Sequence, residues 1–501
     1  MGNRRKKIWV KGGDNMKKQK IVPIVIIMLL FMLAATAIMM LLFRKHFQGT
    51  EEANAKEGVI LLGDITTCEP FKEVPIWVGE GTKMSEAKER GNMVYMIDVN
   101  GATKDQYDNY LKLLEKTGFK KHSDNGAEGG EGYVYASAFT KKDLTVTVSY
   151  SVKAGKSYLT ASRNMPLSDY LLEENADSES NLPGAATKLH MVQVNENGNS
   201  FVVQLKNGHF LVHDGGKERD APYLLDYLDS LTPGDEKPII DAWFISHPHD
   251  DHYGAMRRIA LEPEHYSRIY VKGIYFVEPS NEVISGYTAN STYNSSMGVS
   301  VQMVTLCANA FQSPDGKKCQ VYRPQLGQRY YFSDTIVDVA FTSEQLVDAD
   351  VTTDVNDTST CFIHIIEGQR IMLGGDLGKA GTKIMMKHFD QEYFKFDVFS
   401  VLHHGINVYD YFTDYCDIKT LLYTSWRSGS IWTDGTWKEA AQENIRLKNS
   451  VEEYYHHGDG SVVLTFPYEL GEAEIAEPFD WRYNLTEPGQ PDRDESYWAG
   501  Q

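Results

Sequence analysis

Hydrophobic side chains are most concentrated near the start of the chain. The segment 21–43 holds 23 consecutive residues without a charged side chain, enough to cross a bilayer core of about 30 Å as a helix. Pro23 falls in its first turn, where a helix tolerates proline. Eight Lys or Arg side chains lie within residues 1–20, and Arg44 and Lys45 follow the segment. This excess predicts a single-pass membrane anchor with a cytoplasmic N-terminus and the rest of the chain outside the cell.

Two other interpretations of this segment fit less well. A cleaved signal peptide usually has a shorter apolar region, of about 7–15 residues, and a small-residue cleavage site after it, whereas Arg-Lys-His follows here. A buried core helix rarely contains 23 uncharged residues in a row at an N-terminus. We therefore expect an uncleaved anchor.

Beyond a polar stalk at 44–57, the pattern predicts a small α+β domain over 58–164. Strands are predicted at 92–99, 133–139, 144–150 and 156–162. The segment 103–117 has apolar residues at helical spacing and ends before Gly118, which is typical of a helix C-cap. No catalytic signature falls in this domain, so we expect it to be dispensable for chemistry. An acidic segment ending in Pro-Gly predicts a linker at 165–184.

The longest part of the chain alternates between strand and helix patterns. Strands are predicted at 188–194, 201–205, 208–212 and 239–245, with a helix at 221–231. The alternation continues to about residue 466 and predicts a layered domain of the α/β class over 185–470. The last segment, 471–501, is acidic and contains prolines, which predicts a frayed tail.

Composition and charge narrow the class of protein. Apolar residues make up 42% and charged residues 24% of the 501 positions, which excludes a disordered or fibrous chain. After residue 45 the chain carries 40 basic and 68 acidic side chains, a net charge of −28. Nucleic-acid binding depends on Lys and Arg contacts to phosphates, so this balance disfavours a nucleic-acid partner. No repeat period indicates a solenoid.

Cysteine usage excludes a disulfide scaffold, because five residues in 501 are too few. Cys307 and Cys319 flank a polar loop and could form one bridge. Cys361 lies in an apolar run and is predicted to be a core residue.

The strongest chemical signal is the segment 246–252 (SHPHDDH), which directly follows an apolar strand. His247 and His249 lie two apart on an extended stretch, so their rings point the same way and can bind one ion. Asp251 and His252 come where the chain turns into a helix and can face a second ion. Imidazole and carboxylate suit zinc, and also manganese or iron. The alternative is a polar loop with incidental histidines.

This pattern resembles the metallo-β-lactamase superfamily of metallohydrolases. Further matching motifs are FLVHDGG at 210–216, NDTS at 356–359, IMLGGD at 371–376 and VLHHG at 401–405. The last motif and NDTS resemble the branch that contains the extracellular domain of the competence protein ComEC and the phosphorylcholine esterases. The resemblance implies a four-layer αβ/βα sandwich over about 185–466, preceded here by the small α+β domain and the transmembrane helix.

The resemblance also implies roles for residues outside the histidine motif. Asp376 would bridge two divalent ions, and Asp214 would support a ligand histidine. His403 and His404 are both candidate ligands; adjacent residues of a strand point to opposite sides, which leaves open which one binds. Ser246 and Asn356 are candidates for contact with the substrate or with a ligand.

Two motifs of the branch are missing. A His-Pro pair expected after VLHHG is absent from 430–437, although Asp434 could replace the histidine, and a Gly-x-Gly-Asp-Ser motif is replaced by ENGNS at 196–200. The remaining histidines have ordinary interpretations. His213 and His364 are predicted to be structural, His456 and His457 to be exposed turn residues, and Asp250 to cap the helix that follows.

The predicted activity is metal-dependent hydrolysis outside the cell. A metal-bound hydroxide would attack the substrate, and Asp251 would accept its proton as well as bind metal. The branch favours a phosphodiester of the cell wall, a lipid headgroup or another small molecule. Two alternatives stay open: a binding or sensor protein with a degenerate site, and a nuclease of the DNA-uptake type.

Overall fold

The computed structural model describes ten stretches of the chain, and the account below concerns these residues. They are 62, 68–127, 134–176, 180–195, 197–280, 283–284, 297–348, 355–406, 408–425 and 437–476. All of them belong to one compact unit, Leu61–Gln501. The predicted anchor at 21–43 and stalk at 44–57 lie outside this description, as does most of the predicted tail. Among the described helices, none has the length and apolar character needed to span a bilayer.

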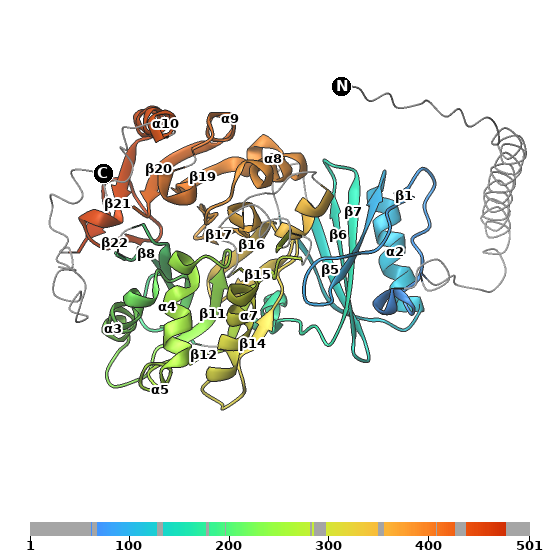
Figure 1. Ribbon diagram of the computed structural model, residues 1–501, viewed down its shortest axis with the longest axis horizontal. Helices are drawn as coiled ribbons and strands as arrows, with labels where there is room; N and C mark the ends of the chain where they lie inside the picture. Colours follow the sequence, from blue (N-terminus) through green and yellow to red (C-terminus); the bar gives the residue numbers. More distant parts are fainter. Residues whose placement is uncertain are drawn as a thin grey trace, which may run out of the picture. The chain divides into compact units, whose positions relative to one another are not determined.

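The first part of the chain forms a seven-stranded sheet in which every strand pair is antiparallel, with one long helix beside it (Figure 1). Its elements are β1 (Lys83–Met84), β2 (Lys88–Glu89), β3 (Tyr95–Asn100), α2 (Lys104–Lys116), β4 (Lys120–Ala127), β5 (Val134–Lys141), β6 (Leu144–Ser151) and β7 (Lys156–Arg163). Helix α2 begins with a capping box in which Thr103 accepts a hydrogen bond from the backbone of Gln106. Its buried face consists of Tyr107, Tyr110, Leu111 and Leu114, four of the apolar positions of the predicted helix.

Two larger sheets follow and face one another. The first has the order β14-β13-β11-β10-β9-β8-β22-β23, with β12 beside β11, and the second runs in sequence order from β15 to β21. Phe201 and Phe244 of the first sheet pack in one buried cluster with Val339 and Phe362 of the second. This shared core holds the two sheets together.

The strands of the first large sheet are β8 (Lys188–Met191), β9 (Ser200–Gln204), β10 (Phe210–Asp214), β11 (Ile239–Ile245), β12 (Tyr270–Val271), β13 (Gly273–Phe276), β14 (Gln320–Tyr322), β22 (Val462–Thr465) and β23 (Glu474–Ile475). Those of the second are β15 (Arg329–Phe332), β16 (Thr335–Phe341), β17 (Cys361–Ile366), β18 (Gln369–Leu373), β19 (Lys395–Ser400), β20 (Asp417–Tyr423) and β21 (Glu453–His456).

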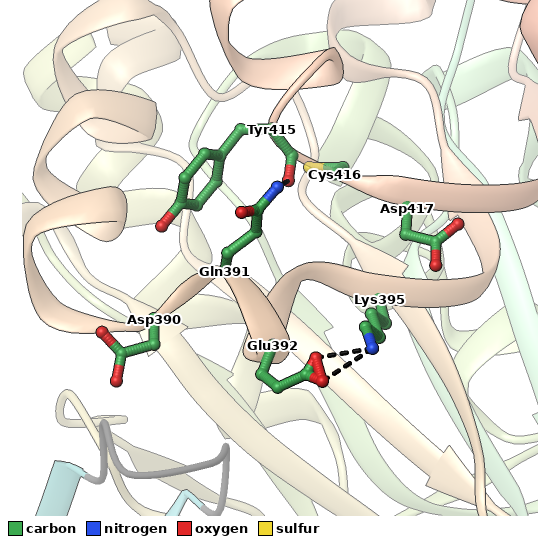
Figure 2. A pocket seen from close by; sticks show the side chains of 7 residues that line it. All are labelled: Asp390, Gln391, Glu392, Lys395, Tyr415, Cys416 and Asp417. Carbon is green, nitrogen blue, oxygen red and sulfur yellow. Dashed lines mark hydrogen bonds and ion pairs between the residues drawn. The ribbon is translucent and has the colours of Figure 1, made fainter.

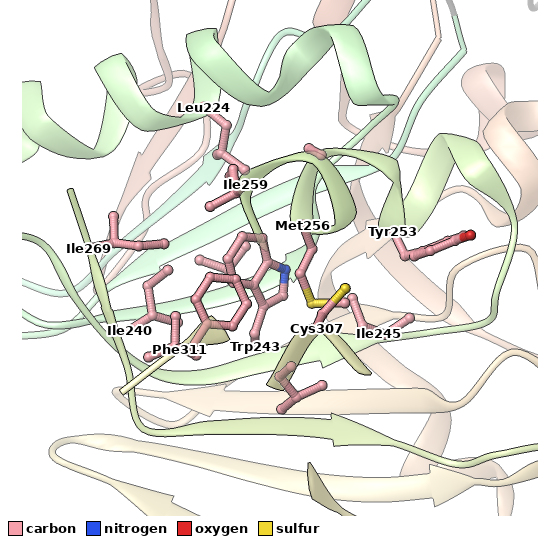
Figure 3. Packing of buried hydrophobic residues seen from close by; sticks show 14 of the residues in the cluster. Leu224, Ile240, Trp243, Ile245, Tyr253, Met256, Ile259, Ile269, Cys307 and Phe311 are labelled. Atoms are coloured by element: carbon pink, nitrogen blue, oxygen red, sulfur yellow. The ribbon is translucent and has the colours of Figure 1, made fainter. Parts of the chain in front are cut away.

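Helices pack against the other face of each large sheet. On the first sheet they are α3 (Ala221–Leu231), α4 (Asp250–Leu261), α5 (Pro263–Tyr266) and α7 (Met297–Cys307). Figure 3 shows Leu224 of α3 and Met256 of α4 packed around Trp243 of β11, with Phe311 stacked on the indole at 6.0 Å. On the second sheet, α8 (Lys379–His388), α9 (Asp410–Thr413) and α10 (Trp437–Ser450) contribute to a separate core.

Short 3-10 helices connect many of these elements. They are η2 (Glu69–Phe71), η3 (Asp169–Leu171), η4 (Glu173–Asn175), η5 (Glu218–Asp220), η7 (Ala308–Ala310), η8 (Ser343–Asp348), η9 (Val355–Thr358), η10 (Gln391–Phe394), η11 (Leu402–Gly405) and η13 (His457–Asp459).

The predicted fold class was wrong. The α/β class requires strands that alternate with helices and pair in parallel, but 13 of the 20 pairs between described strands are antiparallel. The reason is that β9 and β10, β15 and β16, and β17 and β18 follow one another through short connections without a helix between them, and such connections join antiparallel strands. The described chain therefore mixes helices with antiparallel and mixed sheets. The transmembrane helix that formed part of the predicted fold is not among the described helices.

The small sheet is attached to the large sheets through buried contacts. Met96, Val134 and Tyr158 belong to the same buried cluster as Phe341 and Phe396 of the second large sheet. The division of 58–470 into two domains and a linker stays a prediction. Within the predicted linker, Leu171 lies in the shared core, and Ser168 Oγ lies 2.7 Å from the hydroxyl of Tyr275.

All five cysteines are free thiols, so Cys307 and Cys319 do not form the bridge considered from the sequence. Both lie in the apolar core beneath α4, and burial raises the pKa of each thiol to about 12. Cys361 is fully buried in β17, which confirms its prediction as a core residue.

Candidate metal centre

The histidine motif lies where β11 ends and α4 begins. The chain bends at 246–248, and His249, which has extended backbone, precedes the first helical residue, Asp250. His247 is fully buried, and its Nε2 lies 2.8 Å from Nδ1 of His249, so the two rings meet as their spacing predicts. Asp250 makes no capping hydrogen bond. Its side chain is 62% exposed and lies 3.9 Å from Arg257, so the predicted capping role is wrong.

Asp376 follows β18 in a tight connection to α8 and is 2% exposed. The preceding Gly375 has φ +53°, and a Cβ on it would lie 2.6 Å from the Cβ of Ser246. This close approach requires glycine and brings the second large sheet against the histidine motif. The backbone N–H of Asp376 donates to Ser359 Oγ at 3.2 Å, which fixes the start of the connection.

His403 and His404 do not continue β19 as a strand. Both have left-handed backbone conformations, with φ of 50° and 56°, so the chain turns sharply within η11 instead of forming a regular helix. The turn brings both rings to Asp376: His403 Nε2 lies 3.6 Å from Oδ2, and His404 Nε2 lies 3.5 Å from Oδ1. The expectation that one ring points away was therefore wrong, because it assumed extended backbone.

These connections assemble two groups of three ligand atoms each. One group is His247, His249 and Asp376; the other is Asp251, His252 and His404. In each group the atoms all lie within 4.8 Å of one another. The structure thus brings together six of the seven predicted ligands, and the seventh, His403, borders the first group and is 19% exposed.

The carboxylate of Asp376 lies between the two groups. Its Oδ2 is 3.8 Å from His247 Nε2, whereas its Oδ1 is 3.1 Å from His252 Nε2. One oxygen therefore faces each group, which is the arrangement a bridging ligand needs.

Asp214 supports the centre from the end of β10. It is 1% exposed and has a left-handed φ of 56°. Its Oδ1 accepts from the backbone N–H of Ser246 at 2.8 Å, and its Oδ2 accepts from the side chain of Asn199 at 2.6 Å. His252 Nδ1 lies 2.7 Å from the same Oδ2. A carboxylate accepts, so His252 carries its hydrogen on Nδ1 and directs Nε2 into the site.

His404 is oriented in the same way by Thr424. Its Nδ1 lies 3.1 Å from the Thr424 carbonyl oxygen, which can only accept, so Nδ1 carries the hydrogen. The Nε2 lone pair then points toward two carboxylates: Asp251 Oδ2 and Asp376 Oδ1, each at 3.5 Å. Nε2 of His404 and Nε2 of His252 are buried and make no hydrogen bond within the described chain.

The charges of the histidine and aspartate side chains in the centre shift one another's pKa values. Burial opposes a charge on the imidazole of His252, but the carboxylates of Asp376 and Asp214 outweigh it and hold its pKa well above the usual value. At Asp376, burial favours the neutral acid, yet the neighbouring imidazoles outweigh it and hold the pKa well below its usual range. Burial lowers the pKa of His247 and keeps its ring neutral. A neutral imidazole is the form that binds a metal ion.

This donor set fits divalent metal ions. Neutral imidazole nitrogens and carboxylate oxygens are ligands of zinc, manganese and iron. In His404 the Nε2 lone pair and the carboxylates of Asp251 and Asp376 repel one another unless a cation lies between them. No other group of three or more potential ligands of this kind occurs in the described residues.

Other predicted residues have different positions. Asn356 is buried in η9 and its carbonyl accepts from the backbone N–H of Ser359, which places it beside the centre. His213 and His364 are buried between the large sheets with their Nε2 atoms 2.7 Å apart. His456 and His457 were predicted to be exposed, but they are 1% and 0% exposed. His456 ends β21 and stacks on Tyr423, which explains its burial. Asp434 and Glu196 lie outside the described residues.

Sequence reasoning assigned no role to three residues that hold ligands in place. They are Asn199, Ser359 and Thr424. Ser359 belongs to the NDTS motif, which was a usable signal, whereas Thr424 follows a strand without any motif. The structure alone shows that these side chains reach Asp214, His247 and His404.

An open cavity of about 540 Å³ lies at the opposite end of the second large sheet (Figure 2). It is lined by Asp390, Gln391, Glu392, Lys395, Tyr415, Cys416 and Asp417. Lys395 and Asp417 begin the parallel strands β19 and β20, whereas His403, His404 and Thr424 follow the ends of these strands. This cavity is therefore separate from the candidate metal centre.

Comparison of the sequence with protein-family models and with curated proteins gives no match.

Proposed function

We propose that the chain is a metal-dependent hydrolase that binds two divalent ions, with zinc favoured over manganese or iron. The observation that carries the proposal is the orientation of His404. Its Nδ1–H is bound to a carbonyl, and its Nε2 lone pair faces Asp251 and Asp376 at 3.5 Å each. A cation bound there turns this repulsion into attraction. The resemblance of the ligand motifs to the metallo-β-lactamase superfamily supports the same proposal.

The proposed roles follow from position. His247, His249 and Asp376 would hold one ion, and Asp251, His252, His404 and Asp376 the other. When bound, such ions lower the pKa of a coordinated water and polarise the bond to be hydrolysed. The side chain of Asp251 is 28% exposed, more than that of Asp376, and is placed to accept a proton. Asp214 orients its histidine neighbours, and Asn356 lies where it can position a ligand or the substrate.

We propose a phosphodiester substrate outside the cell, of small-molecule, lipid or cell-wall origin. The support is the HHG motif at 403–405, which resembles the phosphodiesterase branch, and the charge of the 21–43 flanks, which favours an outward-facing ectodomain. The net charge of −28 after residue 45 argues against nucleic acid.

Elemental analysis and a substrate panel test this proposal. The purified full chain, loaded with zinc or manganese, is assayed on a phosphomonoester, a phosphodiester, a lactone, a β-lactam and duplex DNA. We expect two ions per chain and the fastest turnover on the phosphodiester. The matched control is His265→Ala, which removes a histidine that pairs with Glu262 far from the centre. A chain that binds both ions but hydrolyses nothing would instead be a binding or sensor protein; a chain that binds no metal would overturn the proposal.

A further inference from the structure

The hydroxyl of Ser246 lies beside Asp214, the carboxylate that supports the candidate centre. Its side chain is buried, and its Oγ donates to Asp214 Oδ2 at 2.8 Å. The same Oγ lies 3.1 Å from Nδ1 of His247 and 3.2 Å from Nδ1 of His252. A second hydroxyl, Ser359 Oγ, also lies 3.2 Å from Nδ1 of His247. A hydroxyl has one hydrogen, and here it is directed to the carboxylate, which can only accept. Ser246 therefore accepts from His247, so the ring nitrogen that faces it carries the hydrogen.

This assignment determines the chemistry of His247. With the hydrogen on Nδ1, its Nε2 presents a lone pair toward His249 and Asp376, as a ligand must. His252 receives the same assignment directly, because its Nδ1 lies 2.7 Å from Asp214 Oδ2. His247 belongs to the first ligand group and His252 to the second.

We infer that Asp214 sets the metal-binding tautomer of one histidine in each ligand group, directly for His252 and through the Ser246 hydroxyl for His247. Ser246 is thus a positioning residue for the first ion. This inference rests on the proposed function, because it concerns how strongly each ion is held.

The packing around Ser246 supports this role independently. A Cβ on Gly375 would lie 2.7 Å from Ser246 Oγ, so the glycine leaves the space that the hydroxyl occupies. The backbone N–H of Ser246 donates to Asp214 Oδ1 at 2.8 Å. Because this backbone bond does not depend on the side chain, Ser246→Ala removes the hydroxyl and keeps the loop in place.

Stepwise zinc binding by the full chain tests the inference. The ion-free protein is titrated with zinc in competition with a chromophoric chelator, and His249→Ala shows which binding step belongs to the first group. We expect Ser246→Ala to weaken the first-group ion by about 10-fold, the low end of the usual effect of removing a partner of a ligand, because Ser359 Oγ still contacts His247. The second-group ion should change by less than about threefold, because the bond from His252 to Asp214 remains. Asp214→Asn should weaken both ions.

Thr360→Val is the matched control. Thr360 is 1% exposed and its backbone N–H donates to the carbonyl of Ser246 at 2.9 Å, but its hydroxyl has no partner among the described residues. Both zinc affinities should stay at the wild-type values. If Ser246→Ala also keeps both affinities, or loses both equally, the inference is overturned while the proposed function stands. A wild-type chain that binds no zinc overturns both.

Discussion

Three residues of the candidate centre adopt backbone conformations that L-residues avoid. Asp214, His403 and His404 all have positive φ without being glycine. Each such backbone conformation costs about 1–2 kcal/mol, so contacts with surrounding residues must stabilise it. At Asp214 these contacts are the hydrogen bonds from Asn199 and Ser246. Strain of this kind is characteristic of functional sites.

Removal of the charge at Asp376 should separate metal binding from folding. Asp376→Asn keeps the size of the side chain but leaves two cations with less negative charge between them. We expect at least one ion to be lost and hydrolysis to fall by orders of magnitude, as measured by elemental analysis beside turnover. Asp390→Asn makes the same exchange at the opposite end of this sheet and should keep both ions. Two retained ions and unchanged turnover in Asp376→Asn would refute the assignment of the centre.

At Gly375, the addition of a single methyl group should destabilise the fold and the candidate centre. Gly375→Ala places a Cβ 2.6 Å from that of Ser246, in addition to a φ of +53°. Gly368→Ala, at φ +79° with nothing within 4 Å, has the backbone penalty alone. We expect Gly368→Ala to cost about 1 kcal/mol of unfolding free energy and Gly375→Ala about 1–3 kcal/mol more, with loss of metal. Denaturant unfolding measures both, and equal costs would show that the close approach to Ser246 is unimportant.

Much of this centre could be predicted from residue spacing. The pair His247 and His249 was predicted from their two-residue spacing, and their rings do meet, although the chain bends at 246–248. The mutual arrangement of His403 and His404 could not be predicted. The rule that successive side chains point to opposite sides holds only for strands, and these residues form a left-handed turn. In the local sequence, only the following Gly405 indicates such a turn. Partners such as Thr424 come from the next strand, and only the folded chain brings them close.

At the scale of secondary-structure elements, the local hydrophobic pattern predicted individual helices and strands better than it predicted the fold class. The helix predicted at 103–117 is α2 (Lys104–Lys116), and the strand predicted at 239–245 is β11 (Ile239–Ile245). Helix α2 has apolar residues at helical spacing and a capping box, and β11 is a nearly continuous apolar run. The predicted fold class was wrong because short connections, such as the one between β17 and β18, join antiparallel strands. The α/β prediction had treated every helix as a crossover between parallel strands.

The small sheet was expected to be dispensable for chemistry, but its contacts indicate a role in stability. Ser149 Oγ on β6 donates to the carbonyl of Leu326 at 2.6 Å, and both are buried. Ser149→Ala leaves that carbonyl without its partner and should lower the unfolding free energy by about 1–3 kcal/mol.

Ser157→Ala is the control for this prediction. Ser157 is fully buried on the neighbouring β7, and its hydroxyl has no partner among the described residues. We expect a change below about 0.5 kcal/mol in thermal or denaturant unfolding, since no hydrogen bond is lost. Equal effects of the two substitutions would mean that the bond to Leu326 does not attach the small sheet.

At the scale of the whole molecule, bound ions should stabilise the fold, because their ligands come from both large sheets. A ligand that binds only the native state adds about 2.7 kcal/mol at a concentration 100 times its Kd. We expect zinc to raise Tm by several degrees and a chelator to reverse the rise. Asp376→Asn should reduce the shift. A Tm that does not respond to zinc or chelator would contradict metal binding between the sheets.

The position of the chain relative to the membrane stays a prediction from the sequence, since 21–43 lies outside the described residues. Eight basic side chains before the apolar segment favour an N-terminus inside the cell. A protease added to intact cells should therefore digest the part that follows residue 46. Complete protection until lysis would reverse the predicted orientation.

The division of ligands between distant parts of the chain limits where the protein can acquire its ions. His247 and His249 lie before β15, whereas Asp376, His403 and His404 lie after β18. If the chain is exported unfolded, as its predicted orientation implies, it would have no complete set of ligands on any short stretch and would cross the membrane without bound ions. The ions would then come from the compartment in which the two sheets finally pack together, and the metal supply of that compartment would decide which ion the protein binds.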